Sequence, residues 1–171
     1  MEPCGWTQEQ DKFMLELKIT ICIPNYNSIK TIQKVLDSVK GYPTLIYDNG
    51  STDGSEKFAS KVIPRLNVRD KYWNISRVRK ELVKDCQTEY MMCLDSDTPC
   101  PVPIEELYAE FEEGVGAVGC KIGNANHQTL QCLLIKTEYA KKLNWNLVFN
   151  KCECRNVTDQ LKKLKLIIIT I

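Results

Sequence analysis

The sequence predicts an α/β protein, a sheet with helices packed on both faces. Short apolar or β-branched runs alternate with amphipathic segments along most of the chain, which is typical of this class. Three of the apolar runs lead straight into polar clusters, as strands do at the ligand-binding edge of an open α/β sheet. With 171 residues, 43% of them hydrophobic and 26% charged, the chain can build one core. We therefore expect a single domain over residues 1–171, with a polar appendage at 1–17 that carries a capping box from Thr7 to Gln10.

The first half of the chain predicts strands separated by helices. The run at 18–23 is β-branched and ends at Pro24, and apolar residues at helical spacing follow it. The expected elements are strand 18–23, a helix carrying Ile29 to Val39, strand 44–47, a helix capped by Asp53 and Glu56 that runs to about Val62, a short strand 65–68 and a helix marked by Ile75, Val78, Leu82 and Val83.

The second half continues the alternation with shorter elements. Three prolines at 99, 101 and 103 form a stiff passage into a helix, and no structure is assigned to 144–150. The expected elements are strand 89–94, helix 104–113, strand 116–122, strand 130–135, a short helix from Thr137, a helix with Val157, Leu161 and Leu164, and a last strand 166–171.

Asp95-Ser96-Asp97 is the most informative stretch. Residues i and i+2 at an extended strand end point to the same side, so Asp95 and Asp97 can face one site. Mg²⁺ and Mn²⁺ prefer carboxylate oxygens and often share them with substrate phosphates. The alternative is a solvated turn, because Asp and Ser favour turns.

Two further polar clusters follow strands. They are Asn25-Tyr26-Asn27 and Asp48-Asn49-Gly50-Ser51, and with the Asp95 cluster they should meet at one edge of the sheet. This convergence is the strongest physical argument for a binding site.

Charge and cysteine content narrow the function further. The net charge is +1, so no overall field favours nucleic acid or a membrane surface. No apolar stretch is long enough to span a bilayer, and no signal peptide is recognisable, which favours a cytoplasmic protein. The nine cysteines lack zinc-type spacing. Cys22 and Cys93 lie in predicted strands as buried apolar residues, and one or two disulfides stay open.

The polar clusters, in this order and spacing, resemble the N-terminal half of family 2 glycosyltransferases with the GT-A fold. The matching pieces are 23–27, 46–53 and 89–97, and the resemblance covers roughly 18–122. It implies a Rossmann-like mixed sheet flanked by helices. A short, cysteine-rich member suggests a hyperthermophile or an archaeal virus, in the latter case acting in the host cytoplasm.

The resemblance also implies roles at the donor site. Asp97 would be the main metal ligand, with Asp95 toward the ribose or a metal-bound water. Tyr26 would lie against the nucleotide base, Asp48 would accept hydrogen bonds from it, and Asn49 would share or take that role. The other implied donor-site residues are Pro24, Asn25, Ser96 and Arg79, with Arg77 as the alternative to Arg79.

An inverting transfer needs a general base for the acceptor hydroxyl. The resemblance places it near 152–155, where Glu153 is the first candidate and Asp159 the second. Cys154 stands where the family has a second acid. His127, the only histidine, is a weaker candidate for a phosphate or metal contact.

The predicted activity is metal-dependent transfer of a sugar from a nucleotide-diphosphate sugar, with UDP favoured over GDP and inversion favoured. The acceptor, a glycan, protein or lipid, is not specified, and a homodimer is one option. One alternative is a non-catalytic nucleotide-sugar-binding or structural protein. Another is a sugar-phosphate nucleotidyltransferase, although the loop at 25–28 lacks the glycines of that class. Nucleic-acid binding is disfavoured despite a scatter of basic residues from Lys61 to Lys84.

Overall fold

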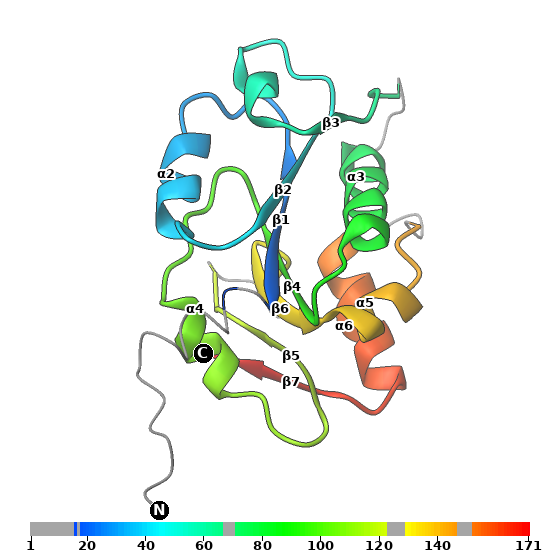
Figure 1. Cartoon of the computed structure of the whole chain (residues 1–171). Coiled ribbons are helices and arrows are strands. Elements are labelled where there is room, and N and C mark those ends of the chain that lie inside the picture. The colour runs from blue at the N-terminus through cyan, green and yellow to red at the C-terminus, as the bar shows by residue number, and fades with distance from the viewer. Residues whose placement is uncertain (1–15, 17, 67–70, 123–128, 147–151) are drawn as a thin grey trace, which may run out of the picture.

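A computed structural model of the chain describes Glu16 and residues 18–66, 71–122, 129–146 and 152–171. In this part of the chain seven strands form one sheet in the order β3-β2-β1-β4-β6-β5-β7 (Figure 1). The strands are β1 (Ile19–Asn25), β2 (Thr44–Asp48), β3 (Lys61–Val62), β4 (Tyr90–Leu94), β5 (Val115–Gly119), β6 (Cys132–Lys136) and β7 (Ile167–Thr170). The helices are α2 (Ile32–Ser38), the 3₁₀ turn η1 (Ser55–Phe58), α3 (Lys71–Asp85), α4 (Ile104–Ala109), α5 (Thr137–Lys142) and α6 (Glu153–Lys163).

The sheet is mixed, which confirms the predicted fold class. β1 runs parallel to both β2 and β4, so the carboxyl ends of these three strands share one edge. β6 runs antiparallel to β4 and to β5, and β5 pairs in parallel with β7. The parallel half therefore carries all three polar clusters, while the other half extends the sheet away from them.

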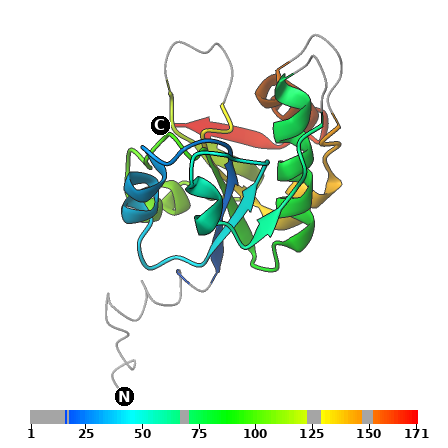
Figure 2. The ribbon, with the colours of Figure 1, turned by 90° about the horizontal axis from the view of Figure 1, so that it is seen from above.

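Helices cover both faces and divide the core in two. On β1, Ile19, Ile21 and Ile23 face the layer that contains α2 and α4, and Cys22 faces the layer that contains α3, α5 and α6. Figures 1 and 2 show these helix groups on opposite sides of the sheet. The period-2 alternation and the burial of both faces explain why the strand reads as a continuous apolar run.

Two predicted elements between β2 and α3 are wrong. The helix expected from Asp53 to about Val62 is only the short turn η1. Of the strand expected at 65–68, residues 67 and 68 lie outside the described part, residues 65 and 66 are not in a strand, and the strand found here is β3, four residues earlier. The backbone after η1 pairs with β2, because Ser60 N–H donates to the Ile46 carbonyl at 3.0 Å and Ile63 N–H donates to the Asp48 carbonyl at 2.7 Å. Sheet hydrogen bonds therefore replace the helical ones that the local sequence favoured.

Other predicted helices and strands are confirmed, although their ends are shifted. Some predictions fall on residues outside the described part of the chain. The helix expected at 104–113 ends at Ala109, and β5 and β6 lie within a few residues of their predicted ranges. The capping box at 7–10 and His127 lie outside the described residues. Eight cysteines of the described part are thiols, with Cys22 and Cys93 buried as expected. Within the same part, none of the helices combines the length and apolarity that a membrane crossing requires.

Candidate active site

The carboxyl ends of β1 and β2 are joined by a dense hydrogen-bond network. Asn25 Nδ2 donates to Asp48 Oδ1 at 2.7 Å, and the backbone N–H groups of Gly50 and Ser51 donate to Asp48 Oδ2 at 2.8 and 2.9 Å. Gly50 has a φ of +77°, which favours glycine and lets the chain turn back onto the carboxylate. Asp48 is only 1% exposed. Its oxygens are therefore committed to the loop, and Asp48 shapes the site from behind.

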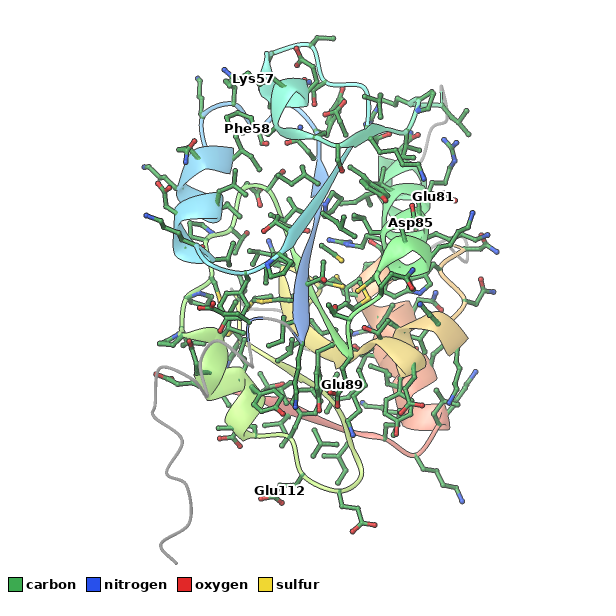
Figure 3. All side chains as sticks on the ribbon, viewed as in Figure 1. Lys57, Phe58, Glu81, Asp85, Glu89 and Glu112 are labelled. Atoms are coloured by element: carbon green, nitrogen blue, oxygen red, sulfur yellow. The ribbon has the colours of Figure 1, made fainter. Side chains whose placement is uncertain are left out.

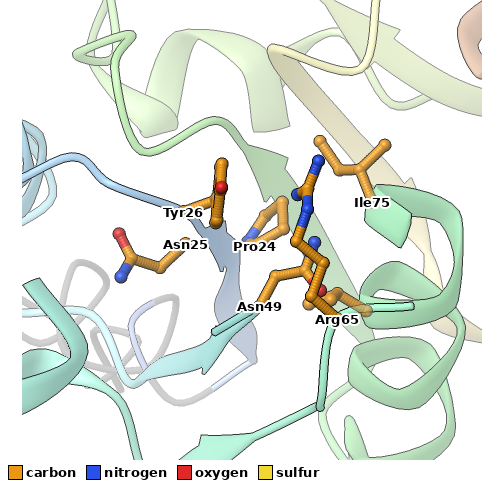
Figure 4. A pocket seen from close by; sticks show the side chains of 7 residues that line it. Pro24, Asn25, Tyr26, Asn49, Arg65 and Ile75 are labelled. Carbon is orange, nitrogen blue, oxygen red and sulfur yellow. The ribbon is translucent and has the colours of Figure 1, made fainter. Parts of the chain in front are cut away.

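A pocket of about 290 Å³ opens beside this network. Its lining residues are Pro24, Asn25, Tyr26, Asn49, Arg65, Ile75 and Val78 (Figure 4). The Arg65 guanidinium lies over the Tyr26 ring, 4.1 Å from its centroid. The Oδ1 atom of Asn49 is buried and has no hydrogen-bond partner among the described residues. A buried acceptor without a partner is costly, so it marks the place where a ligand donor would fit.

The Asp95-Ser96-Asp97 loop starts directly after β4. Thr31 Oγ1 donates to the Ser96 carbonyl at 2.9 Å and so ties the loop to the start of α2. Asp97 is exposed, and Thr98 Oγ1 donates to its Oδ1 at 3.0 Å. Asp95 is mostly buried and forms an ion pair with Arg79 of α3. The two carboxylates therefore differ, since Asp97 faces solvent and Asp95 is already neutralised by a neighbour.

Arg79 also pairs with Glu153, the first residue of α6. The side chains of Arg79 and Glu153 are 5% and 3% exposed. Ser76 Oγ lies 3.1 Å from Glu153 Oε1 and 2.8 Å from the Trp145 carbonyl oxygen, so these two acceptors share one hydroxyl proton. With its side chain only 3% exposed, Glu153 is closed to solvent in this arrangement.

Burial and charge have opposite effects on the pKa values in the cluster formed by Arg79, Asp95 and Glu153, called the Arg79 cluster below. Burial raises the pKa of both the Asp95 and the Glu153 carboxyls, and the nearby Arg79 cation opposes that rise. Burial alone would lower the pKa of Arg79, but Glu153 and Asp95 raise it above its ordinary value. The guanidinium therefore stays charged and holds two carboxylates from distant segments together.

The remaining candidates lie on α6. Asp159 is half-buried and lies six residues after Glu153 on the same helix. Cys154 is half-buried, and burial raises the pKa of its thiol. The nearby Arg79 guanidinium opposes that rise in the pKa of Cys154.

Three of the basic residues are paired, buried or stacked on an aromatic ring. Lys61 lies 3.1 Å from both Glu81 and Asp85, which project from α3 (Figure 3). Arg79 is buried and Arg65 covers Tyr26.

Two residues of the site were missed by sequence reasoning. Arg65 was only one of several scattered cations, and Ser76 only a polar residue on an amphipathic helix. Arg65 lines the pocket and Ser76 bonds Glu153. A polar side chain on the buried side of a helix was the one available signal for Ser76, and Arg65 gave no signal before the fold was known.

The donor set suits a hard divalent cation shared with phosphates. Among the described residues no three His, Cys, Asp or Glu side chains are arranged to hold a metal ion by themselves. Asp95 and Asp97 supply hard carboxylate oxygens at the mouth of the site, and Mg²⁺ or Mn²⁺ commonly takes one or two such ligands plus substrate oxygens. The residues present therefore fit a metal that arrives with a diphosphate.

A mixed sheet of this order, with a pocket and paired aspartates at the carboxyl ends of β1, β2 and β4, defines a GT-A glycosyltransferase. The sequence model of glycosyl transferase family 2 matches residues 20–164, and the chain belongs to that family. No curated protein sequence matches the chain.

Solved structures support the fold. Glucosyl-3-phosphoglycerate synthase of M. tuberculosis aligns over 97% of this chain and 74% of its own, with a TM-score of 0.68 and 19% identity. The same enzyme has been solved with Mn²⁺ and UDP-glucose, again with a TM-score of 0.68 and 19% identity, over 97% of this chain and 73% of that one. TarS of S. aureus aligns over 90% of this chain and 35% of its own, with a TM-score of 0.66 and 16% identity. These similarities are to the fold.

Proposed function

We propose that the protein transfers a sugar from a UDP-sugar to a hydroxyl acceptor in a reaction that depends on a divalent metal. The observation that carries the proposal is the unpartnered Oδ1 atom of Asn49, a residue that lines the pocket together with Tyr26. Uracil presents an N–H donor flanked by carbonyl groups, which an amide side chain can match with its oxygen and nitrogen. A related fold solved with Mn²⁺ and UDP-glucose supports the same donor class.

Each donor-site residue then has a distinct task. Tyr26 stacks on the base, Asn49 reads its edge, and Asp48 with Asn25 holds the loop that presents Asn49. Asp97 and Asp95 would hold the metal together with diphosphate oxygens. When bound, the metal supplies positive charge for the departing nucleoside diphosphate. Arg79 keeps Asp95 oriented toward the same place.

The acceptor side rests on α6. For direct displacement, which inverts the anomeric carbon, a base must take the acceptor proton. Glu153 remains the first candidate, and because its side chain is only 3% exposed, its use requires the residues around it to move when substrates bind. Asp159, on the same helix, is the second candidate.

A non-catalytic nucleotide-sugar-binding protein is the second function to weigh. Glu153 is buried and paired with Arg79, and Cys154 stands where a second acid would be expected. Such a protein would bind UDP-sugar and metal yet release no UDP in the presence of any acceptor.

Calorimetric titration tests the donor half of the proposal. UDP, GDP, UDP-glucose and GDP-mannose are titrated with and without Mn²⁺ into the wild type, Asp97→Asn and the matched control Asp37→Asn, an exposed residue of α2. We expect UDP and UDP-sugar binding that strengthens with Mn²⁺, and loss of that metal effect in Asp97→Asn only. Absence of nucleotide binding, or an unchanged metal effect in Asp97→Asn, would contradict the proposal. UDP release with an acceptor mixture then separates the enzyme from the non-catalytic alternative.

A further inference from the structure

Three thiols meet where the Asp97 loop passes the ends of β5 and β6. The sulfur of Cys132, in the first residue of β6, lies 3.3 Å from that of Cys120 and 3.9 Å from that of Cys100. Cys120 comes directly after β5, and its N–H donates to the Cys132 carbonyl at 3.2 Å. Cys100 lies three residues after Asp97. Segments separated by up to 32 residues in the sequence therefore place their sulfurs in contact around Cys132.

The three thiols differ in their access to solvent. Cys132 and Cys120 are 0% and 3% exposed, whereas Cys100 is only half-buried. The contact with Cys132 also lowers the pKa of the Cys100 thiol. A dissolved oxidant would therefore meet Cys100 first and as the more readily ionised thiol. The two buried thiols are placed to respond only after Cys100 has reacted.

The surroundings favour a disulfide over a metal–thiolate complex. The cluster packs against the apolar core that includes Ile104 and Leu134. The nearest charges that act on it, Glu105 on Cys100 and Glu106 on Cys120, are negative. A metal held by three thiolates would add negative charge there, whereas a disulfide is neutral and apolar. Forming the bond requires two sulfurs to approach from 3.9 Å to ~2 Å.

We propose that Cys100 and Cys132 form a reversible disulfide, with Cys120 as a second thiol able to exchange with Cys132. The proposed oxidant is a low-molecular-weight disulfide such as oxidised glutathione. The Cys100 thiolate attacks one of its sulfurs and releases one glutathione thiolate, which leaves Cys100 in a mixed disulfide. The released glutathione thiolate takes the proton of Cys132. The Cys132 sulfur then attacks the Cys100 sulfur and releases the second glutathione as a thiolate. This second thiolate takes up the proton that Cys100 gave up. The protein loses two electrons and two protons, and the oxidant becomes two thiols.

The disulfide would fix the loop that carries Asp97. That loop is already held on one side, because Ser38 Oγ accepts from the Cys100 N–H at 3.0 Å and Thr31 Oγ1 donates to the Ser96 carbonyl at 2.9 Å. A bond to Cys132 would attach it to β6 as well. We expect slower hydrogen exchange at 96–103 by on the order of tenfold, and a melting temperature higher by roughly 5–15 °C.

Mapping of the oxidised native protein tests the proposal. The folded protein is treated with oxidised glutathione, remaining thiols are alkylated, and disulfide-linked peptides are identified by mass spectrometry. We expect an intact mass lower by two hydrogens, with Cys132 in every linked pair and Cys100 as its first partner. Cys22 and Cys86 are neighbours and are both less exposed than Cys100. They should remain thiols and serve as an internal control.

Three variants and one control variant test the roles of the individual cysteines. Cys132→Ala should abolish the disulfide, Cys100→Ser should slow it strongly because only buried thiols remain, and Cys120→Ser should leave the Cys100–Cys132 bond intact. Cys93→Ala, which removes an equally buried thiol from the opposite face of the sheet, should change nothing. Circular dichroism checks that each variant folds. A native protein that resists oxidation, a linkage without Cys132, or equal rates in Cys100→Ser would overturn the proposal. None of these readouts needs nucleotide binding, so they are independent of the proposed transferase activity.

Discussion

The pocket beside Tyr26 and Asn49 and the cluster of Arg79, Asp95 and Glu153 share one edge of the sheet but differ in how far their polar groups are paired. The pocket keeps a buried acceptor, Asn49 Oδ1, without a partner and rests Arg65 on Tyr26. The cluster pairs Arg79 with both Asp95 and Glu153. The pocket region therefore has a hydrogen-bond acceptor without a partner, whereas the charges of the Arg79 cluster are paired without a ligand. The difference teaches that one edge of a sheet can hold both an unsatisfied polar group, which a ligand could pair, and a buried ion-pair network that is already satisfied.

Removal of the cluster's cation should have the largest effect. In Arg79→Met, Asp95 and Glu153 keep their buried carboxylates without a counter-charge, so we expect a loss of about 3–5 kcal/mol in the free energy of unfolding at neutral pH. The deficit should shrink as the pH falls, because protonated carboxyls need no cation. Urea unfolding at several pH values measures both effects.

Arg77→Met is the matched control for that change. Arg77 lies on the same helix and donates to the Pro64 carbonyl at 3.1 Å from an accessible position. Its loss should cost no more than about 0.5 kcal/mol. Similar losses in the two variants would show that the Arg79 ion pairs contribute little.

Glu153→Gln tests whether Glu153 acts as the general base during turnover. If Glu153 is the base, the turnover number should fall by about 10²–10⁴ while UDP affinity is retained, since the base acts only on the acceptor. Steady-state kinetics and UDP titration are compared with those of Asp159→Asn. A parallel loss of UDP affinity and turnover would instead assign Glu153 to the support of Arg79 and Asp95.

Asn49→Leu removes the unpartnered acceptor from the pocket. We expect UDP affinity to fall by about tenfold, the value of one neutral hydrogen bond. Asn49→Asp keeps an acceptor at the same place and should retain most of the affinity. Calorimetric titration measures the difference, and thermal unfolding checks the fold. Equal affinities for Asn49→Leu and the wild type would remove Asn49 from base recognition.

Arg65→Ala should have the smallest effect. With the guanidinium 4.1 Å from the Tyr26 centroid, no space remains between them for a base, so Arg65 must move when the base stacks. Removing it should strengthen uridine binding by roughly two- to fivefold, because a cation–π contact is no longer lost. Arg65→Lys is the comparison, since it keeps the charge. Weaker uridine binding in Arg65→Ala would show that Arg65 holds the base instead of covering its place.

The strand and helix order was largely predictable, and so was the edge that carries the site. The apolar runs at β1, β2 and β4 and the polar residues that end them are local signals, and parallel pairing brings their ends together. The region from Asp53 to Leu66 was not predictable in the same way. Its helical signals are local, whereas its backbone pairs with β2 because β2 offers an open edge there.

Local patterns in the sequence thus determined which residues stand at the ends of the parallel strands, because periodicity and turn chemistry act over a few positions. Only the tertiary structure decided which of them are available to a ligand. Asp48 and Asn49 are neighbours, yet Asp48 turns into a saturated network and Asn49 toward the pocket. Arg79 meets Glu153 across 74 residues, and that contact alone makes Glu153 a buried ion-pair partner. Burial and ion pairing depend on which distant segments meet, and no local pattern encodes that choice.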